Sequence, residues 1–195
     1  MKRLFDITFS LVGLVLLFPV FVIVAILIKI NSRGPIFFIQ KRVGRHFRIF
    51  NIYKFRTMIE KEGLLITARG DARITNVGNF LRKTKIDELP QLFNVLKGDM
   101  SFVGPRPEVP YYVNMFAEDE KAILTVLPGI TDWASLWDSD EGAILSGSPD
   151  PEKTYQEKIR PTKIRLQLKY VKENNFWIDM EIIFKTMKKL FQRVY

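Results

Sequence analysis

Residues 7–28 constrain the fold more than any other part of the chain, because these twenty-two consecutive residues carry no charge. A helix of that length is about 33 Å long, close to the roughly 30 Å of a bilayer's hydrocarbon core. The stretch has no polar face, which disfavours a helix buried in a soluble core. A cleaved signal peptide is also disfavoured, since the apolar run is long and no cleavage site of small residues follows it. We therefore predict a retained membrane segment over residues 1–30.

Basic residues flank this segment on both sides. Lys2 and Arg3 precede it, and six more follow it: Lys29, Arg33, Lys41, Arg42, Arg45 and Arg48. Positive charge on both flanks places both of them on the cytoplasmic side of a membrane. Pro19 removes one helical hydrogen bond near the middle and kinks the helix. A re-entrant helix that breaks at Phe18-Pro19 and returns to the same face satisfies both signals. The alternative is a kinked single span, oriented by the downstream cluster.

The net charge of +9 lies entirely in the N-terminal quarter of the chain. Residues 1–56 contain ten Lys or Arg and one acid, whereas residues 57–195 contain twenty of each sign. Such an excess indicates a phosphate-bearing partner, on nucleic acid or on an anionic membrane. Residues 35–58 predict two short strands around Val43-Gly44-Arg45, with basic residues between aromatic ones. The neighbouring membrane segment favours membrane lipid headgroups or a phosphorylated substrate, and we expect no nucleic-acid partner.

The rare residue types exclude several kinds of site. The chain has no cysteine, which excludes a disulfide framework, a thiolate metal site and a cysteine nucleophile. His46 is the only histidine, so a metal site of several histidines is excluded, as is any serine triad that does not use His46. No acid lies near His46 in the sequence, and we expect it at the surface or facing a phosphate rather than in catalysis.

Residues 71–107 predict two short helices with an acidic pair between them. Thr75 can cap a first helix that runs through Arg82, and Gly98 is a natural stop for a second helix. Pro90 has no amide donor, which places it in the first turn of the second helix. Asp87 and Glu88 are then expected at the N-terminus of that helix, where free amides stabilise negative charge and bind anions.

Two interpretations of the acidic pair remain open at this point. In the first, Asp87 caps the helix and Glu88 decorates its first turn. In the second, an ionised carboxylate lies beside a phosphate, with a divalent cation neutralising both. A carboxylate held in that way can act as a nucleophile on phosphorus.

Several sequence strings together resemble one family. They are DELPQL at 87–92, NVLKGDMSFVGPRP at 94–107, YKFRTM at 53–58 and PGIT at 128–131. They follow a proline-containing hydrophobic segment and a basic hairpin in the order typical of the bacterial sugar transferases, the monotopic phosphoglycosyl transferases. The resemblance covers essentially the whole chain. It corresponds to the minimal form of that family, without an additional multi-span N-terminal domain.

The resemblance implies a mixed α/β monotopic membrane protein. Its residues 1–30 would form a re-entrant helix broken at Phe18-Pro19, which supports the hairpin over the span. Residues 31–195 would form a catalytic domain with a short β-hairpin and several interfacial amphipathic helices. The expected location is the cytoplasmic face of the bacterial inner membrane.

The resemblance also implies a reaction and its residues. Asp87 would attack the β-phosphate of a UDP-sugar, release UMP, and pass the phosphosugar on to undecaprenyl phosphate. Glu88 would assist, Mg²⁺ would bind at the pair with Asp87 as its ligand, and Arg106 would hold a phosphate. Lys54, Arg56 and Arg82 are further candidates for phosphate contacts, or else members of structural ion pairs. A non-catalytic, membrane-anchored adaptor that binds phosphate or lipid is the competing hypothesis. The sequence does not identify the sugar, and it leaves a homo-oligomer open.

The chain departs from the family after PGIT. The commoner continuation is glycine, an apolar or Trp residue, alanine and glutamine, whereas Asp132-Trp133-Ala134-Ser135 stands here, without the glycine and the glutamine. This departure leaves the chemistry intact but affects the expected contacts to the sugar or the nucleotide. The acidic stretch Asp138 to Glu152 follows, and it is either a mobile flap or a solvated connection.

The C-terminal third predicts two helices. One runs from Thr162 to Glu173, after Arg160-Pro161. The other shows apolar residues at helical spacing with basic residues on other faces. Its apolar members are Phe176, Trp177, Met180, Ile183, Phe184, Met187, Leu190, Phe191 and Val194. Such a helix lies at a membrane surface or packs against the protein's own core, and the sequence favours neither.

Overall fold

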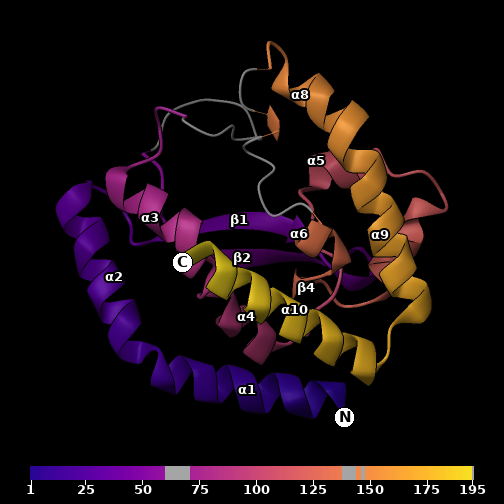
Figure 1. The fold of residues 1–195 in the computed structure, drawn as a ribbon, viewed down its shortest axis with the longest axis horizontal. Helices are drawn as coiled ribbons and strands as arrows, with labels where there is room; N and C mark the ends of the chain where they lie inside the picture. The colour runs from indigo at the N-terminus through magenta and orange to yellow at the C-terminus, as the bar shows by residue number, and fades with distance from the viewer. Residues whose placement is uncertain (60–70, 138–143, 146–147, 195) are drawn as a thin grey trace.

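The computed structural model describes residues 1–59, 71–137, 144–145 and 148–194, and Figure 1 shows their arrangement. Helices mix with strands, and the described strands form two small sheets of two strands each, which confirms the mixed α/β class. In chain order the elements are α1 (Lys2–Leu16), α2 (Phe18–Asn31), β1 (Phe37–Val43), η1 (Arg45–Phe47), β2 (Ile49–Phe55), α3 (Asn76–Thr84), η2 (Ile86–Glu88), α4 (Gln91–Lys97), β3 (Ser101–Val103), α5 (Pro110–Val113), η3 (Glu120–Thr125), β4 (Gly129–Thr131), α6 (Trp133–Trp137), α8 (Pro151–Thr154), η4 (Tyr155–Ile159), α9 (Arg160–Glu173) and α10 (Phe176–Val194).

The apolar N-terminal segment forms two helices, α1 and α2, which meet at a bend of 59°. The bend falls at Leu17, one residue before the predicted break at Phe18-Pro19. Pro19 lies in the first turn of α2, where its missing N–H would have no helical partner in any case. Within the described residues no single helix is long and apolar enough to cross a bilayer, and only the bent pair together reaches that length and composition.

Polar contacts fasten the first turns of α1 to the rest of the protein. The Arg3 guanidinium donates to the carbonyls of Val95 and Leu96, at 2.6 and 2.8 Å. A carboxylate oxygen of the buried Asp6 accepts hydrogen bonds from Ser101 Oγ and from the next backbone amide, at 3.0 and 3.1 Å. These bonds tie the start of the apolar segment to the end of α4 and to β3.

The far end of the helix pair is fastened to the same body. The Arg56 guanidinium donates to the carbonyls of Ser32 and Arg33, at 2.8 and 2.5 Å. Apolar side chains of α2 also pack against the hairpin and α3, in a buried cluster of Val24, Ile28, Phe55 and Leu81. Both ends of the bent helix pair are therefore attached to one body.

The predicted hairpin is confirmed. β1 and β2 pair antiparallel, from Phe37 opposite Phe55 to Val43 opposite Ile49. Phe50 and Ile52 point into the core, where they meet Val95 and Met100. The connection contains a short 3₁₀ turn in which the exposed His46 has a positive φ of 55°. His46 is thus a surface residue, as expected.

The two C-terminal helices are also confirmed. α9 begins at Arg160, two residues before the predicted start, with Pro161 in its first turn. One face of α10 buries Ile182 in a cluster with Val103 and Tyr170. Another face stays uncovered and presents four large apolar side chains, namely Trp177, Phe184, Met187 and Phe191. α10 therefore packs on the protein's own core and still leaves an apolar stripe free.

The acidic stretch 138–152 falls partly outside the described residues, at 138–143 and 146–147. Its expected role as a flap or a solvated connection therefore stays a prediction. In the part that is described, Leu145 is buried, and Asp150 caps α8 by accepting a hydrogen bond from the Lys153 amide at 3.0 Å.

Candidate active site

Asp87 and Glu88 lie in η2, a single 3₁₀ turn between α3 and α4. This corrects the expected position at the N-terminus of α4, which begins at Gln91 with Pro90 as its N-cap residue. Lys85 explains the difference, because its left-handed backbone, with φ of 59°, ends α3 and starts a new turn before α4. The acidic pair is therefore held between two helices rather than at the start of one.

Local sequence features fix α3 beside the hairpin. The Thr75 hydroxyl accepts a hydrogen bond from the Gly78 amide at 2.9 Å, which confirms the predicted cap. Gly78 also lets the helix approach β2's end closely, since a Cβ added there would lie 2.0 Å from the Thr57 carbonyl oxygen. This close approach sets the position of η2, which follows α3 directly.

Glu88 is the centre of an ion-pair network. Its Oε1 lies 2.8 Å from Lys54 Nζ of β2 and 2.5 Å from the Arg106 guanidinium, which also donates to Oε2 at 3.2 Å. Burial opposes the charge of Glu88, but Arg106 and Lys54 outweigh it and hold its pKa well below the usual range. Glu88 is thus an ionised residue that orders two cations of the site.

Asp87 has the opposite electrostatic character. Its side chain is buried, and its Oδ1 has no hydrogen-bond partner among the described residues. Burial and the neighbouring Glu88 charge raise the pKa of Asp87 to about 6, although Lys54, Lys85 and Arg82 act in the other direction. A buried carboxylate with an unused oxygen beside several cations is typical of a functional group rather than of a helix cap.

The Pro105-Arg106-Pro107 loop is positioned by the small parallel sheet. β3 pairs with β4, so Ser101 lies opposite Gly129. The Gly129 amide donates to the Pro105 carbonyl at 3.0 Å, and the Gly104 amide donates to the Thr131 carbonyl at the same distance. A Cβ at Gly129 would lie 2.1 Å from the Gly104 nitrogen, and one at Gly104 would lie 2.2 Å from the Leu127 carbonyl oxygen, so both positions need glycine. The PGIT string therefore serves to place Arg106 against Glu88.

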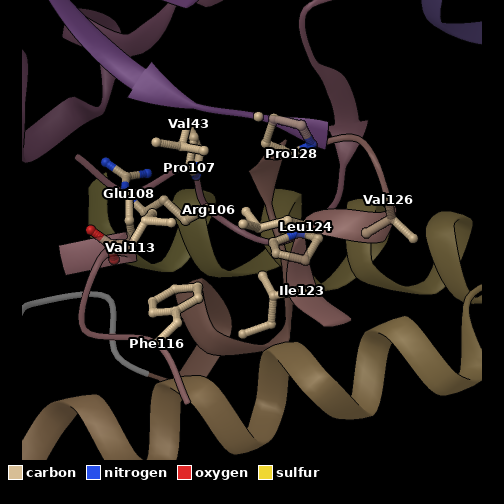
Figure 2. Close-up of a pocket in the computed structure, with 12 residues that line it drawn as sticks. Val43, Arg106, Pro107, Glu108, Val113, Phe116, Ile123, Leu124, Val126 and Pro128 are labelled. Carbon is tan, nitrogen blue, oxygen red and sulfur yellow. The ribbon is translucent and has the colours of Figure 1, made fainter. Parts of the chain in front are cut away.

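A second charged cluster continues from this loop. Glu108 lies 2.8 Å from Lys163 Nζ of α9 and 3.8 Å from the Arg42 guanidinium of β1. Burial opposes its charge, yet Lys163 and Arg42 lower the pKa of Glu108. Arg106 and Glu108 line a narrow crevice of about 10 Å³, which has room for about one water molecule. Figure 2 shows both residues with the others that line it.

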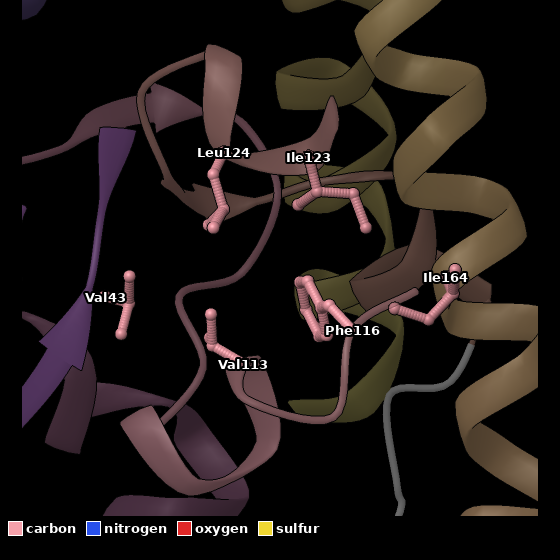
Figure 3. Close-up of a cluster of buried hydrophobic side chains, with 6 residues drawn as sticks. All are labelled: Val43, Val113, Phe116, Ile123, Leu124 and Ile164. Carbon is pink, nitrogen blue, oxygen red and sulfur yellow. The ribbon is translucent and has the colours of Figure 1, made fainter. Parts of the chain in front are cut away.

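The floor of this crevice is apolar. Figure 3 shows Val113, Phe116 and Leu124 facing Val43 of β1, with Ile164 of α9 on the other side. This cluster joins the hairpin to α9 behind the loop that carries Arg106. It is a packed core rather than a substrate pocket, because the crevice that it leaves is so small.

The four basic residues expected at the site differ in their contacts. Lys54 and Arg106 contact Glu88 directly. Arg82 donates to Thr57 Oγ1 at 2.9 Å and lies close enough to Asp87 for their charges to interact. Arg56 instead binds the carbonyls after α2, so the structure places it in the attachment of the helix pair.

The donor set is compatible with Mg²⁺. Among the described residues no three acidic, histidine or cysteine side chains come together as a cation cage. Mg²⁺, however, needs only one or two carboxylates, since water and substrate phosphates supply its other ligands. The unpartnered Oδ1 of Asp87 is an available oxygen of this kind, and the Glu88 oxygens lie on the next residue.

Comparison with known proteins shows the family of the chain. The family model described as bacterial sugar transferase matches residues 1–193, which include every element of the site. The chain belongs to the bacterial sugar transferase family. An undecaprenyl-phosphate glucose phosphotransferase of Komagataeibacter xylinus is 39% identical to this sugar transferase over 198 residues, covering 96% of this chain and 35% of that protein.

Two further relatives cover nearly the same part of this sugar transferase. A UDP-N-acetylgalactosamine-undecaprenyl-phosphate N-acetylgalactosaminephosphotransferase of Aeromonas hydrophila is 39% identical over 97% of this chain and 43% of its own length. The uncharacterized sugar transferase EpsL of Bacillus subtilis (strain 168) is 35% identical over 97% of this chain and 87% of its own length. The chain thus spans less than half of the first two relatives and most of the third.

The departure after PGIT has a structural role in this sugar transferase. Asp132 is buried, and its Oδ1 accepts a hydrogen bond from the Ser135 amide at 2.7 Å. Its Oδ2 accepts one from Gln167 of α9 at 3.4 Å. Asp132 therefore fixes the junction between β4, α6 and α9. Its effect on sugar or nucleotide contacts stays a prediction.

Sequence reasoning missed four charged residues around the site. For Glu108, one sequence feature could have indicated a role at the site, namely its position directly after Pro-Arg-Pro. Lys85 had none, because a left-handed backbone at a lysine is not visible in a sequence. Arg42 and Lys163 come from β1 and α9, and only the folded chain brings them to Glu108.

Proposed function

We propose that this sugar transferase moves a phosphosugar from a UDP-sugar to undecaprenyl phosphate through a covalent intermediate on Asp87. Release of UMP accompanies the first step, and the product begins the membrane stage of glycan or glycoconjugate assembly. The observation that carries the proposal is the buried Asp87 carboxylate with an unpartnered oxygen, next to a Glu88 that holds Lys54 and Arg106. The names of the relatives support the acceptor, since the three phosphotransferases of K. xylinus, A. hydrophila and Salmonella typhimurium all name undecaprenyl phosphate.

The residues of the site divide the chemistry between them. With a pKa of about 6, Asp87 is ionised above neutral pH and can attack the β-phosphorus of the donor. The bond from that phosphorus to the bridging oxygen breaks, and UMP leaves with the electron pair. A phosphate oxygen of undecaprenyl phosphate then attacks the phosphosugar and restores the Asp87 carboxylate.

Arg106 and Lys54 are suited to hold the phosphates during both steps. Arg106 presents a planar fork of donors that matches phosphate geometry, and Glu88 fixes the orientation of both cations. Asp87, with Glu88 beside it, would hold Mg²⁺. When bound, that ion supplies positive charge that offsets the repulsion between a carboxylate nucleophile and a phosphate.

The proposal includes a membrane location. The bent pair exposes large apolar side chains along its length, including Phe9, Leu16, Phe18 and Ile30, at 53%, 72%, 66% and 79% exposure. Residues 1–30 would enter one leaflet and return, and residues 31–195 would lie on the cytoplasmic face of the bacterial inner membrane. UDP-sugars are soluble and undecaprenyl phosphate is a lipid, so the site must lie where both can reach it.

Membership of the family does not determine which sugar is transferred. The relatives' names specify glucose, N-acetylgalactosamine and galactose. The test is therefore a screen of UDP-sugars for UMP release by the purified protein with undecaprenyl phosphate and Mg²⁺. We expect release with at least one donor, and its loss in Asp87→Asn. Absence of release with every donor would favour the alternative, a membrane-anchored adaptor that binds phosphate or lipid.

A further inference from the structure

A basic groove lies between α6, α9 and α10, on elements that carry none of the proposed catalytic residues. It has a volume of about 500 Å³, against about 10 Å³ for the crevice at Arg106. Figure 1 shows α6 between α9 and α10. A volume of this size is in the range of sites that bind small molecules or headgroups.

Cations dominate the lining of this groove. Its described lining includes no acid and five basic side chains, Arg165, Lys169, Lys185, Lys188 and Lys189. Lys169 and Lys185 have acidic neighbours, Glu173 at 3.9 Å and Glu181 at 2.6 Å. Arg165 and Lys188 form no ion pair with any described residue. Clustered charge of one sign in a concave surface attracts anions more strongly than scattered charge does.

Aromatic side chains form the apolar part of the groove. The ring of Trp133 lies close to two of the cations, with Lys185 Nζ at 4.9 Å and Lys169 Nζ at 5.9 Å from its centroid. Trp137 also lines the groove and is 46% exposed. The groove thus combines fixed cations with an amphipathic surface, the combination that proteins use at the level of lipid headgroups.

The position of the groove along α10 indicates which kind of anion it binds. Lys185 and Lys188 line the groove, and their sequence neighbours Phe184 and Met187 belong to the exposed apolar stripe, at 72% and 49% exposure. Successive helical residues point about 100° apart, so the lysines lie along one border of that stripe. A helix whose apolar stripe enters a membrane places the bordering lysines among the headgroups.

We propose that the groove between α6, α9 and α10 binds the headgroup of an anionic phospholipid at the membrane surface. This inference rests on the membrane attachment in the proposed function, and it adds a lipid site that is separate from the acceptor site. The headgroup phosphate would lie between Arg165 and Lys188, with the acyl chains continuing along the apolar stripe of α10. Such a contact would hold α10 flat on the bilayer.

The test measures lipid binding to the purified full chain in micelles of a neutral detergent. Native mass spectrometry would give the affinities for phosphatidylglycerol and for phosphatidylcholine with the same acyl chains. We expect the wild-type protein to prefer phosphatidylglycerol. Arg165→Gln with Lys188→Gln should weaken that lipid roughly 30-fold, from about one kcal/mol per cation near an anionic headgroup. Arg165→Lys should retain most of the binding.

A matched control removes the same charge elsewhere. Lys158 and Lys172 are exposed residues of η4 and α9 outside the groove, and their joint replacement by glutamine should leave phosphatidylglycerol binding unchanged. Equal weakening in both double variants would overturn the proposal, because net charge rather than the groove would then set the affinity. Inorganic phosphate should not compete with the lipid. Competition by phosphate would overturn the lipid assignment in favour of a soluble phosphate ligand.

The outcome is distinguishable from failure of the proposed function. UMP release by the wild-type protein is measured in the same micelles without phosphatidylglycerol. A protein that releases UMP but shows no preference for phosphatidylglycerol would overturn the groove alone. A protein that prefers phosphatidylglycerol but releases no UMP would leave the groove standing and contradict the phosphosugar transfer.

Discussion

Replacement of Asp87 by asparagine should stabilise the fold at alkaline pH and abolish turnover. The reason is the pKa of Asp87, about 6 in the folded protein against an ordinary value of 3.8. The folded protein therefore holds a proton between about pH 4 and pH 6 that the unfolded chain has released. Its stability falls as the pH rises through that window, since the buried charge is unfavourable. An amide carries no such charge.

The magnitude follows from the two pKa values. Their difference, at about 1.36 kcal/mol per pH unit, gives about 3 kcal/mol for a side chain that is only 8% exposed. For a chain of this size, that corresponds to a rise in melting temperature of about 6–12 °C at pH 8. Below about pH 4 the wild-type carboxylate is protonated in both states, and the difference should vanish.

The assay is thermal unfolding in neutral-detergent micelles with a chelator present, followed by tryptophan fluorescence at pH 4 and pH 8. The matched control is Glu88→Gln, whose effect should have the opposite sign. Arg106 and Lys54 lose their buried partner, so this variant should lose about 4 kcal/mol at pH 8 and less in acid. An Asp87→Asn protein that melts at or below the wild-type temperature at pH 8 would contradict a destabilising buried charge at Asp87. An equal gain at both pH values would contradict it too.

Three further outcomes follow from the fold and its proposed membrane setting. Gly78→Ala should lower stability by about 3 kcal/mol in thermal unfolding, because its Cβ meets the Thr57 carbonyl, whereas Gly13→Ala meets only a flexible side chain. High salt should leave the protein in the membrane pellet, since salt screens charges but not apolar embedding, and release by salt alone would contradict the embedded pair. Single cysteines inserted after Met1 and placed at Arg33 should both react only from the cytoplasmic side in intact cells, and labelling of the first from outside would show a span.

The sequence predicted those parts of the structure that depend on neighbours along the chain. The Thr75 cap, the Gly98 stop, the hairpin around Gly44 and the period of α10 all arise from local backbone preferences, and all are present. The bend in the helix pair was placed within one residue because proline has a local effect. The helix boundaries in the structure differ from the predicted ones by one or two residues, because helix ends compete with turns.

The parts that could not be predicted depend on contacts between distant segments. Arg56 carries the same charge as Lys54 two residues earlier, yet one binds the end of α2 and the other binds Glu88. The alternation of a strand cannot decide between these roles, because residues two apart face the same side; Arg56 lies just past the end of β2, where it meets the segment after α2. The separate turn of Asp87 required a left-handed Lys85, which no residue preference indicates. The pairing of Glu108 with Lys163 likewise joins residues 55 positions apart.

The covalent mechanism is tested most directly by the mass of the protein after incubation with its donor alone. With a UDP-sugar and Mg²⁺ but no lipid acceptor, the wild-type protein should gain the mass of one phosphosugar, and peptide mapping should locate it on Asp87. The adduct should disappear when undecaprenyl phosphate is added, and it should be absent from Asp87→Asn. A protein that releases UMP and transfers phosphosugar to the lipid with no adduct at Asp87, or with undiminished transfer in Asp87→Asn, would contradict the covalent mechanism.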